Sequence, residues 1–360
     1  MNKITIAGAG PTGLAAALFL RKKGFDPYIF EKRLERSNLS KAFGVNPRTL
    51  SLLKGTGATE RFLKTGRKMT ALNLWLNGKV VLRNDFSAKK IEFPFMLVQS
   101  QEDSERILEE LLMEAGLRVD RGKELTSVRL QDDSVSYSLI GQNSPIKSEY
   151  FFGADGAGSF TRKSLSLSFD GLMMNDPWNL YDLELEIPLN NDEGHIFLLD
   201  GGAVFIVRLK NNVWRVIGNV DNLLEHLPKG TKTGRIVWDS DFGISHRVIK
   251  QFRHQNVFFG GDAAHIHSGL GARGMNLGIE DAYVFAELYS KQRLDEYNTM
   301  RKPVVDKVMN SIEMMTDVMR GHSFKAKMMR RITPALPIAF GLVRNYATNF
   351  VLGLDHDLEV

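Results

Sequence analysis

The opening of the chain constrains its fold more than any other feature. Residues 3–7 form a short β-branched run that is typical of a buried strand, and they lead directly into Gly8-Ala9-Gly10-Pro11-Thr12-Gly13. Residues 14–23, rich in Ala and Leu, predict a helix, and residues 26–30 predict a second strand that ends at Glu31. This order of strand, glycine turn, helix, strand and acidic residue predicts a βαβ unit that binds a dinucleotide.

Each glycine of the turn has a separate physical role. Gly8 permits the tight turn, Gly10 lets the backbone approach a pyrophosphate at the helix N-terminus, and Gly13 lets helix and strand pack closely. Glu31 can accept hydrogen bonds from an adenosine ribose. This motif alone does not distinguish NAD from FAD.

Two later motifs also follow strand-like apolar runs. Residues 150–152 lead into Gly153-Ala154-Asp155-Gly156-Ala157-Gly158-Ser159, with Arg162 close behind. Residues 257–259 lead into Gly260-Gly261-Asp262-Ala263-Ala264-His265, and a glycine-rich loop, residues 269–278, follows. Asp262 is therefore expected at the carboxyl end of a buried strand, where α/β sheets bind their ligands.

In this order and at this spacing, the three motifs resemble those of the flavin-dependent aromatic hydroxylases, the family of para-hydroxybenzoate hydroxylase. The resemblance extends from residue 1 to about residue 303. It implies an α/β fold: a Rossmann-like FAD-binding domain, an inserted antiparallel β-sheet that binds substrate, and C-terminal helices. It also implies an enzyme, a monooxygenase in which NAD(P)H reduces FAD and a flavin C4a-hydroperoxide hydroxylates an aromatic or conjugated cyclic small molecule. A reductase or dehydrogenase of the same fold, or a flavin-binding protein without turnover, is the alternative.

The resemblance also assigns residues to the flavin. The residues expected at the cofactor are Gly8, Gly10, Pro11, Thr12, Gly13, Glu31, Lys32, Lys41, Gln101, Asp155, Asp262, Gly271, Arg273, Gly274, Met275 and Asn276. Asp262 would bind a ribityl hydroxyl, and the N-terminus of the helix after residue 276 would face the flavin pyrimidine edge. Asp155 could instead cap the turn that follows it, and Gln101 could be a surface residue at a helix start. No residue is assigned as a catalytic base.

The glycine-rich loop of residues 269–278, called the late loop below, departs from the family pattern of proline followed by Gly-Gly-Gln-Gly. Gly269 stands in place of that proline, and Ala272 and Arg273 replace the second glycine and the glutamine. One hypothesis is that Arg273 binds an anionic substrate or stabilises anionic reduced flavin. The alternative is an arginine side chain that points into solvent.

We expect a discontinuous FAD-binding domain over residues 1–70, 98–175 and 237–290. Residues 71–97 and 176–236 would form the substrate sheet, with a hairpin at Asn77-Gly78, and residues 291–360 a helical region. The candidates for lining the substrate pocket are Trp75, His195, Phe197, Phe205, Arg208 and Arg215. A core position is the alternative for the aromatic residues, and a surface position for the two arginines.

Composition excludes several classes of function. The chain has no cysteine, which rules out disulfides and thiolate metal sites. The net charge of +5 is dispersed along the chain, so nucleic acid is not an expected partner. No metal is expected either, because His265 and His267 have no further ligands at suitable spacing. With no signal sequence or spanning segment expected, we predict a cytoplasmic monomer or homodimer, with membrane binding through the basic, Met-rich helices near residue 325 as the less favoured alternative.

Overall fold

The computed structural model describes residues 2–36, 42–332 and 337–360. Its first sheet carries a parallel core in the order β18-β11-β1-β2-β8. The strands of this sheet are β1 (Asn2–Ala7), β2 (Tyr28–Glu31), β8 (Asp120–Arg121), β9 (Leu125–Gln131), β10 (Ser134–Leu139), β11 (Ile146–Gly153), β17 (Arg253–His254) and β18 (Val257–Phe259). The apolar runs of β1, β11 and β18 are almost entirely buried, which explains why they read as continuous rather than alternating hydrophobic segments.

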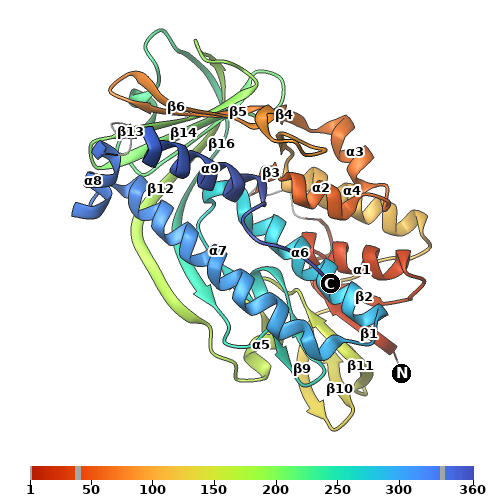
Figure 1. The fold of residues 1–360 in the computed structure, drawn as a ribbon. Helices are drawn as coiled ribbons and strands as arrows, with labels where there is room; N and C mark the ends of the chain where they lie inside the picture. The colour runs from red at the N-terminus through yellow and green to blue at the C-terminus, as the bar shows by residue number, and fades with distance from the viewer. Residues whose placement is uncertain (1, 37–41, 333–336) are drawn as a thin grey trace.

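Helices cover this sheet on one side. Helices α1 (Pro11–Lys22) and α6 (Arg273–Ser290) lie side by side, and α4 (Gln101–Glu114) packs against α1 (Figure 1). The short helices α2 (Pro47–Leu53) and α3 (Ala58–Thr65) lie in the chain between the first two strands of a small sheet, which consists of β3 (Gly44–Val45), β4 (Arg67–Met69) and β7 (Met96–Val98). One large hydrophobic core joins these layers.

The second sheet lies above the first and is mostly antiparallel, in the order β19-β16-β12-β15-β14-β13-β5-β6. Its strands are β5 (Ala71–Leu76), β6 (Lys79–Asp85), β12 (Asp170–Glu186), β13 (Glu193–Leu199), β14 (Gly202–Arg208), β15 (Val213–Gly218), β16 (Lys232–Val248) and β19 (His265–Ile266). The predicted hairpin is confirmed: Asn77 and Gly78 join β5 to β6 with φ of 50° and 73°. Only the β13–β5 pair is parallel.

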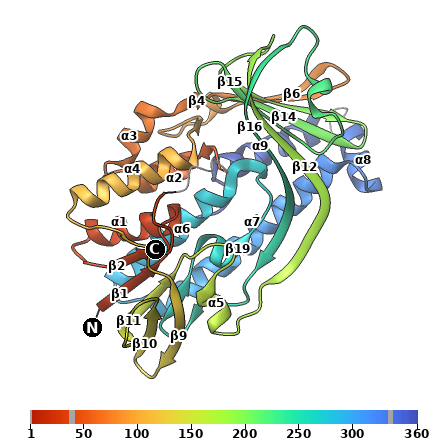
Figure 2. The same ribbon diagram turned by 180° about the vertical axis from the view of Figure 1, so that it is seen from behind.

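Two long strands connect the sheets. β12 and β16 pair along most of their length (Figure 2). They curve from the second sheet down to the first sheet and its helices, which together are called the first module. The expected domain boundaries at residues 175/176 and 236/237 therefore fall inside continuous strands. The short elements between strands and helices are η1 (Phe86–Ala88), α5 (Phe160–Ser164), η2 (Leu223–His226), η3 (Gly261–Ala263), η4 (Leu270–Ala272) and η5 (Leu294–Glu296).

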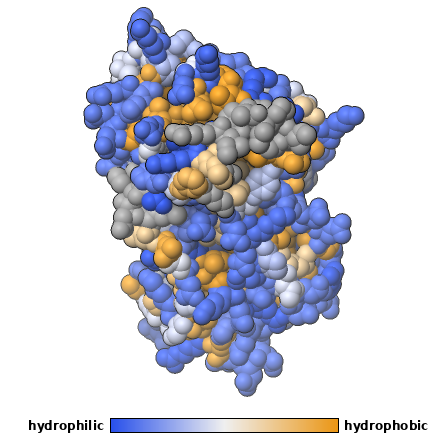
Figure 3. Space-filling view, turned by 60° about the vertical axis from the view of Figure 1, so that its left-hand side comes forward, coloured by the Kyte–Doolittle hydropathy of each residue, from blue (hydrophilic) through white to orange (hydrophobic). Residues whose placement is uncertain are grey.

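The helical region begins with α7 (Tyr297–Arg320), which runs diagonally across the molecule, and continues with α8 (Phe324–Ile332) and α9 (Pro337–Leu352). Phe324, Met328 and Leu342 on α8 and α9 are exposed. Figure 3 shows one face of the molecule, on which apolar surface gathers mainly in the upper half. Among the described residues, no helix combines the length and hydrophobicity needed to cross a membrane. Residues 353–360 then return as an irregular segment, the C-terminal segment, whose end lies near α6 and α1. These elements confirm the predicted fold class.

Candidate cofactor site

The first glycine turn forms an open cradle at the start of α1. Gly10 is the N-cap of the helix, and a Cβ added there would meet no atom within 4 Å. A Cβ at Gly13 would instead collide with the carbonyl oxygen of Gly8, which has φ of +100°. The first turn of α1 contains no acidic residue, so no carboxylate of that turn compensates the positive end of the helix dipole. This arrangement suits a phosphate group.

Glu31 lies at the carboxyl end of β2 and is buried beside the turn. Its Oε2 accepts the Ala9 N–H at 3.0 Å, and its Oε1 accepts the N–H and Nε of Arg33, both at 3.0 Å. Burial alone would raise the pKa of Glu31, but these hydrogen bonds outweigh it and lower the pKa below its ordinary value. Glu31 is therefore ionised, and its carboxylate holds the glycine turn in place through the Ala9 N–H. The neighbouring Lys32 is exposed, and Lys41 lies outside the described residues.

Thr12 brings the first motif against the third. Its side chain fills a notch made by glycines, because a Cβ added at Gly261 or at Gly278 would collide with Thr12 Oγ1. Gly260 is equally restricted, with Phe152 and Thr12 against its α-carbon. Pro11 occupies the first position of α1, where a missing N–H costs nothing.

The middle motif is held by its own side chains. Asp155 accepts hydrogen bonds from the Ser159 hydroxyl and from the N–H and hydroxyl of Thr161, the latter two at 2.9 Å. Asp155 thus caps the turn into α5. Capping this turn was the alternative to contact with the cofactor for this residue. Arg162 donates to the carbonyl of Ala263 at 2.9 Å, so the middle and third motifs are joined directly.

Asp281, which is not among the predicted site residues, organises the third motif. Asp281 is fully buried on α6 and accepts the Gly261 N–H at 2.9 Å, His265 Nε2 at 2.7 Å and Arg301 Nε at 2.6 Å. Burial would raise the pKa of Asp281, but the charge of Arg301 and the bond from His265 lower it below its ordinary value. Asp262 follows Gly261 in η3 with its side chain exposed. In the sequence, this role is indicated only by the position of Asp281, three residues after Gly278.

The late loop packs tightly against β3. Asn276 donates to the Gly44 carbonyl at 2.9 Å and accepts the Asn46 N–H at 3.0 Å. A Cβ added at Gly44 would lie 2.8 Å from the Cβ of Ala272. Gly271 and Ala272 both have left-handed backbones, with φ of 72° and 53°, and for alanine this conformation costs about 1–2 kcal/mol.

Arg273 does not point into solvent, so that alternative is wrong. Its side chain is fully buried, and its NH1 donates to the Phe350 carbonyl and to Asp355 Oδ1, the latter at 2.8 Å. The two residues that follow, Gly274 and Met275, form the first turn of α6. A Cβ added at Gly274 would lie 3.6 Å from the His267 ring, and Met275 is buried.

His267 lies beside this turn as a neutral imidazole. Burial lowers the pKa of His267 to about 3, and its Nδ1 donates to the Ser268 carbonyl at 2.7 Å. The His265 and His267 rings stack with centroids 6.3 Å apart. Across the described parts of the chain, no three His, Asp or Glu side chains are grouped so that they could hold a metal ion.

Gln101 anchors the chain that leads into β3. Its Oε1 accepts the Ala42 N–H at 3.3 Å, its backbone N–H donates to the Ala42 carbonyl at 3.0 Å, and its Nε2 donates to Glu105 at 2.8 Å. Gln101 therefore joins the start of α4 to residue 42 rather than lying free on the surface.

The second sheet turns one face toward this module. Phe205 on β14 stacks on Phe43, with ring centroids 5.8 Å apart. Arg215 on β15 is fully buried, pairs with both oxygens of Asp182 at 2.7 Å, and lies 5.3 Å from the Phe43 ring and 5.5 Å from that of Trp238. We call this set, Phe43, Asp182, Phe205, Arg215 and Trp238, the inner aromatic wall.

Three predicted substrate residues, Trp75, His195 and Phe197, lie on the face of the sheet opposite the inner aromatic wall. Phe197 packs in a second core with Val204, and Trp75 stacks on Phe197 with centroids 5.2 Å apart. His195 shares this face, where its Nδ1 accepts from Trp75 Nε1 at 3.3 Å and burial lowers its pKa. Because the sheet is buried on both faces, alternation along its strands could not indicate which face is which.

Arg208 is also displaced from the expected pocket. It lies at the end of β14 and donates to the Asn211 carbonyl at 2.6 Å, in the turn toward β15. The alternative for this residue was a surface position, and its hydrogen bond to Asn211 is exposed.

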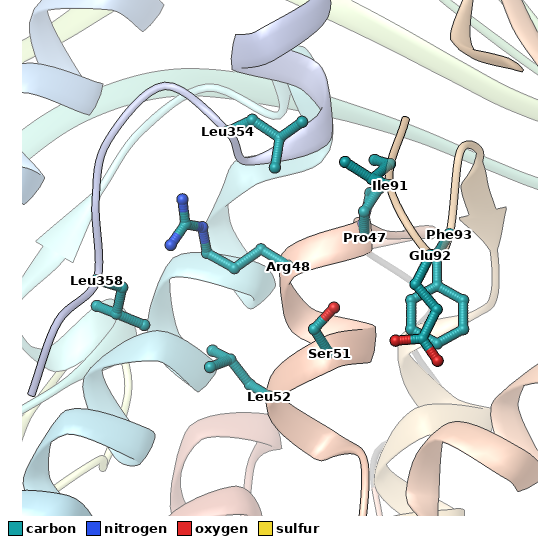
Figure 4. A pocket seen from close by; sticks show the side chains of 9 residues that line it. All are labelled: Pro47, Arg48, Ser51, Leu52, Ile91, Glu92, Phe93, Leu354 and Leu358. Carbon is teal, nitrogen blue, oxygen red and sulfur yellow. The ribbon is translucent and has the colours of Figure 1, made fainter. Parts of the chain in front are cut away.

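A separate pocket of about 270 Å³ lies between α2 and the C-terminal segment. The residues that line it are Pro47, Arg48, Ser51, Leu52, Ile91, Glu92, Phe93, Leu354 and Leu358 (Figure 4). None of the residues predicted at the flavin or the substrate lines this pocket.

Comparison with known proteins now identifies the family. The FAD binding domain model matches residues 1–207 and 219–311. A 12-dehydrotetracycline 5-monooxygenase/anhydrotetracycline 6-monooxygenase of Streptomyces rimosus is 30% identical, over 86% of this chain and 68% of the relative. The pentachlorophenol 4-monooxygenase of Sphingobium chlorophenolicum is 26% identical over 89% of this chain.

Solved structures agree with this assignment. A p-nitrophenol 4-monooxygenase from Pseudomonas putida superposes with a TM-score of 0.81 at 20% identity, over 98% of this chain and 95% of that one. An anhydrotetracycline hydroxylase from Streptomyces rimosus superposes with a TM-score of 0.77 at 25% identity, over 99% of this chain and 77% of that one. The chain spans 61% of the 6-methylpretetramide 4-monooxygenase of Streptomyces rimosus (27% identical, 87% of this chain) and 65% of the pentachlorophenol enzyme. The chain belongs to the FAD binding domain family.

Proposed function

We propose that the chain is an FAD-dependent monooxygenase that uses NAD(P)H and O₂ to hydroxylate an aromatic or conjugated cyclic small molecule. One observation supports this most strongly. The three motifs follow β1, β11 and β18, which are neighbours or near neighbours in one parallel sheet, so that their glycine turns meet at the same edge. Ligands of α/β folds bind at this edge.

The residues at this edge fit FAD. The Gly10 cradle at the start of α1 would hold the pyrophosphate, and Glu31 would lie at the adenosine ribose. The exposed Asp262 would bind ribityl hydroxyls. The loop over Gly271 and the first turn of α6 would face the flavin ring. When bound, FAD supplies the redox chemistry that activates O₂.

The chain's own residues would bind and orient. The free N–H groups at the start of α6 would favour negative charge at the pyrimidine edge of the flavin. The inner aromatic wall offers rings against which a flat substrate could pack. Its paired Arg215 and Asp182 are shielded from water, so a polar substituent near them would be positioned by a strong electrostatic field.

The substrate class follows from this wall and from the relatives. One relative is named for 6-methylpretetramide, one for 12-dehydrotetracycline and anhydrotetracycline, and one for pentachlorophenol. Phenols and fused-ring phenols are therefore the compounds to test first.

The experiment begins with the visible spectrum of the purified protein with added FAD. NAD(P)H oxidation is then followed in air over a panel of phenols, aromatic acids and fused-ring phenols. We expect a bound flavin spectrum and at least one compound that accelerates NAD(P)H oxidation and gains 16 mass units, the mass of one oxygen atom. A protein that takes up no FAD, or that oxidises NAD(P)H only to hydrogen peroxide with every compound, contradicts the proposal.

A further inference from the structure

The position of Arg273 requires a nearby anion. Arg273 is the first residue of α6, where the unpaired N–H groups already carry partial positive charge. A buried cation at this end of a helix is unfavourable unless a carboxylate compensates it. Among the ion pairs of the described residues, Arg273 pairs with Asp355, whose Oδ1 lies 2.8 Å from its NH1.

Asp355 is well suited to this task. It lies in the C-terminal segment, and its side chain is 5% exposed. Burial opposes its ionisation, but the hydrogen bond from His356 and the charge of Arg273 lower the pKa of Asp355 to about 2. It is therefore a carboxylate throughout the ordinary pH range.

The C-terminal segment is anchored on both sides of Asp355. Arg48 of α2 donates to the carbonyls of Gly353 and His356, and Figure 4 shows its side chain extending toward the part of the segment that carries Leu354 and Leu358. Lys307 of α7 donates to the Asp355 carbonyl at 2.6 Å. These contacts fix the position from which Asp355 reaches Arg273.

The end of α9 also contacts the late loop. The Phe350 ring lies against Gly271, where an added Cβ would collide with it, and the Phe350 carbonyl accepts from Arg273. Thus Phe350 contacts the loop, and Asp355 holds the first side chain of the helix that follows it.

We propose that Asp355 is a positioning residue for the flavin loop: through Arg273 it holds residues 269–272 and the first turn of α6 in the conformation that receives the flavin ring. This inference rests on the proposed FAD site. Asp355 itself is not expected to touch the flavin. It compensates the charge that this chain carries where the resembling family has a glutamine.

The test compares Asp355→Asn with Asp357→Asn. Asp357 lies two residues away in the same segment, is exposed, and undergoes the same change of charge. Three properties are measured for each variant: the FAD dissociation constant, the midpoint potential of the bound flavin, and the urea unfolding of the apoprotein. Asp355→Glu and the double variant Arg273→Gln/Asp355→Asn complete the set.

For Asp355→Asn we expect FAD binding weakened about tenfold or more, the scale of one lost charge-assisted hydrogen bond. Its flavin should have a more positive midpoint potential, because Arg273 then carries uncompensated charge near the reduced, anionic flavin. The double variant should return the potential toward that of the wild type, and Asp355→Glu should retain much of the affinity. Asp357→Asn should match the wild type.

The inference is overturned if Asp355→Asn and Asp357→Asn bind FAD equally and with equal potentials, even when the Asp355 variant is less stable, because the role of Asp355 would then be structural only. A double variant with the same shifted potential as Asp355→Asn also contradicts it. If the wild type takes up no FAD, the proposed function fails first and this inference with it.

Discussion

Replacing Gly10 with aspartate would separate cofactor binding from the stability of the fold. Gly10 is the N-cap of α1, with the extended backbone (φ −78°, ψ −177°) that N-cap residues adopt and with no side-chain cap. Aspartate is among the preferred N-cap residues, and it is better than glycine by a few tenths of a kcal/mol. The fold should therefore be unchanged or slightly stabilised, since the added side chain meets no atom within 4 Å of its Cβ.

Binding of FAD should respond in the opposite direction. The new carboxylate would occupy the cradle assigned to the pyrophosphate, roughly 5 Å from its charges. At an effective dielectric constant of about 20, two unit charges at that separation repel by about 3 kcal/mol. Since each 1.4 kcal/mol or so changes affinity tenfold, the dissociation constant should rise by at least about 100-fold.

The matched control is Gly10→Asn, which has the same shape and capping ability but no charge. FAD titration followed by flavin fluorescence gives both dissociation constants, and thermal unfolding of the apoproteins gives their stability. Asn should weaken binding only by the steric effect of its side chain. Equal affinities for the Asp and Asn variants would refute the electrostatic argument, and wild-type affinity in Gly10→Asp would remove the pyrophosphate from this turn.

Three further perturbations test other parts of the account. Asp281→Asn leaves Arg301 without its closest carboxylate, so the free energy of unfolding in urea should fall by about 3–5 kcal/mol. As the control, Asp295→Asn at an exposed position should leave the free energy of unfolding unchanged. A similar small change in both variants would contradict the role of Asp281 as the buried partner of Arg301. Gly44→Ala brings a methyl group within 2.8 Å of the Ala272 Cβ, so FAD titration should show weaker binding, and failure of Ala272→Gly to restore it would argue against this contact. Hydrogen bonds and charges from Asp355 and Glu280 raise the pKa of His356, although burial opposes the shift. The contribution of His356 to the free energy of unfolding is therefore complete at low pH and is lost as the pH rises above about 6.5 through the raised pKa. In urea unfolding over a range of pH, His356→Gln should lack this loss, and parallel pH profiles for variant and wild type would contradict it.

Local sequence patterns predicted the first module well. The glycine turn, the helix and the flanking strands could be read because each depends on a few neighbouring residues, such as Gly10 at the start of α1. The Asn77-Gly78 hairpin was predictable for the same reason, since both residues must adopt positive φ.

Features that depend on contacts between distant segments could not be predicted. Asp281 organises the third motif through Arg301, which lies 20 residues away on another helix. The partner of Arg273 lies 82 residues further along the chain. Neither pairing leaves a periodic or local signal, because the partners meet only when α6, α7 and the C-terminal segment pack together.

The face of the second sheet that each aromatic side chain occupies could not be predicted for a related reason. Trp75, His195 and Phe197 are aromatic and alternate correctly, but both faces of the sheet are covered. The contacts of Phe205 and Arg215 with Phe43 show which face turns toward the first sheet and its helices. A one-residue difference in phase decides between core and pocket, and composition does not reveal it.

The proposed reaction transfers one atom of O₂ to an aromatic substrate. The most direct measurement is the reaction of the FAD-loaded protein with NAD(P)H and ¹⁸O₂ in the presence of the compound that most accelerates NAD(P)H oxidation, followed by mass spectrometry of the product. We expect a product heavier than the substrate by 18 mass units, one ¹⁸O atom, and no label from H₂¹⁸O in the converse experiment. Unlabelled product, or NAD(P)H consumed with all oxygen recovered as hydrogen peroxide, would contradict it.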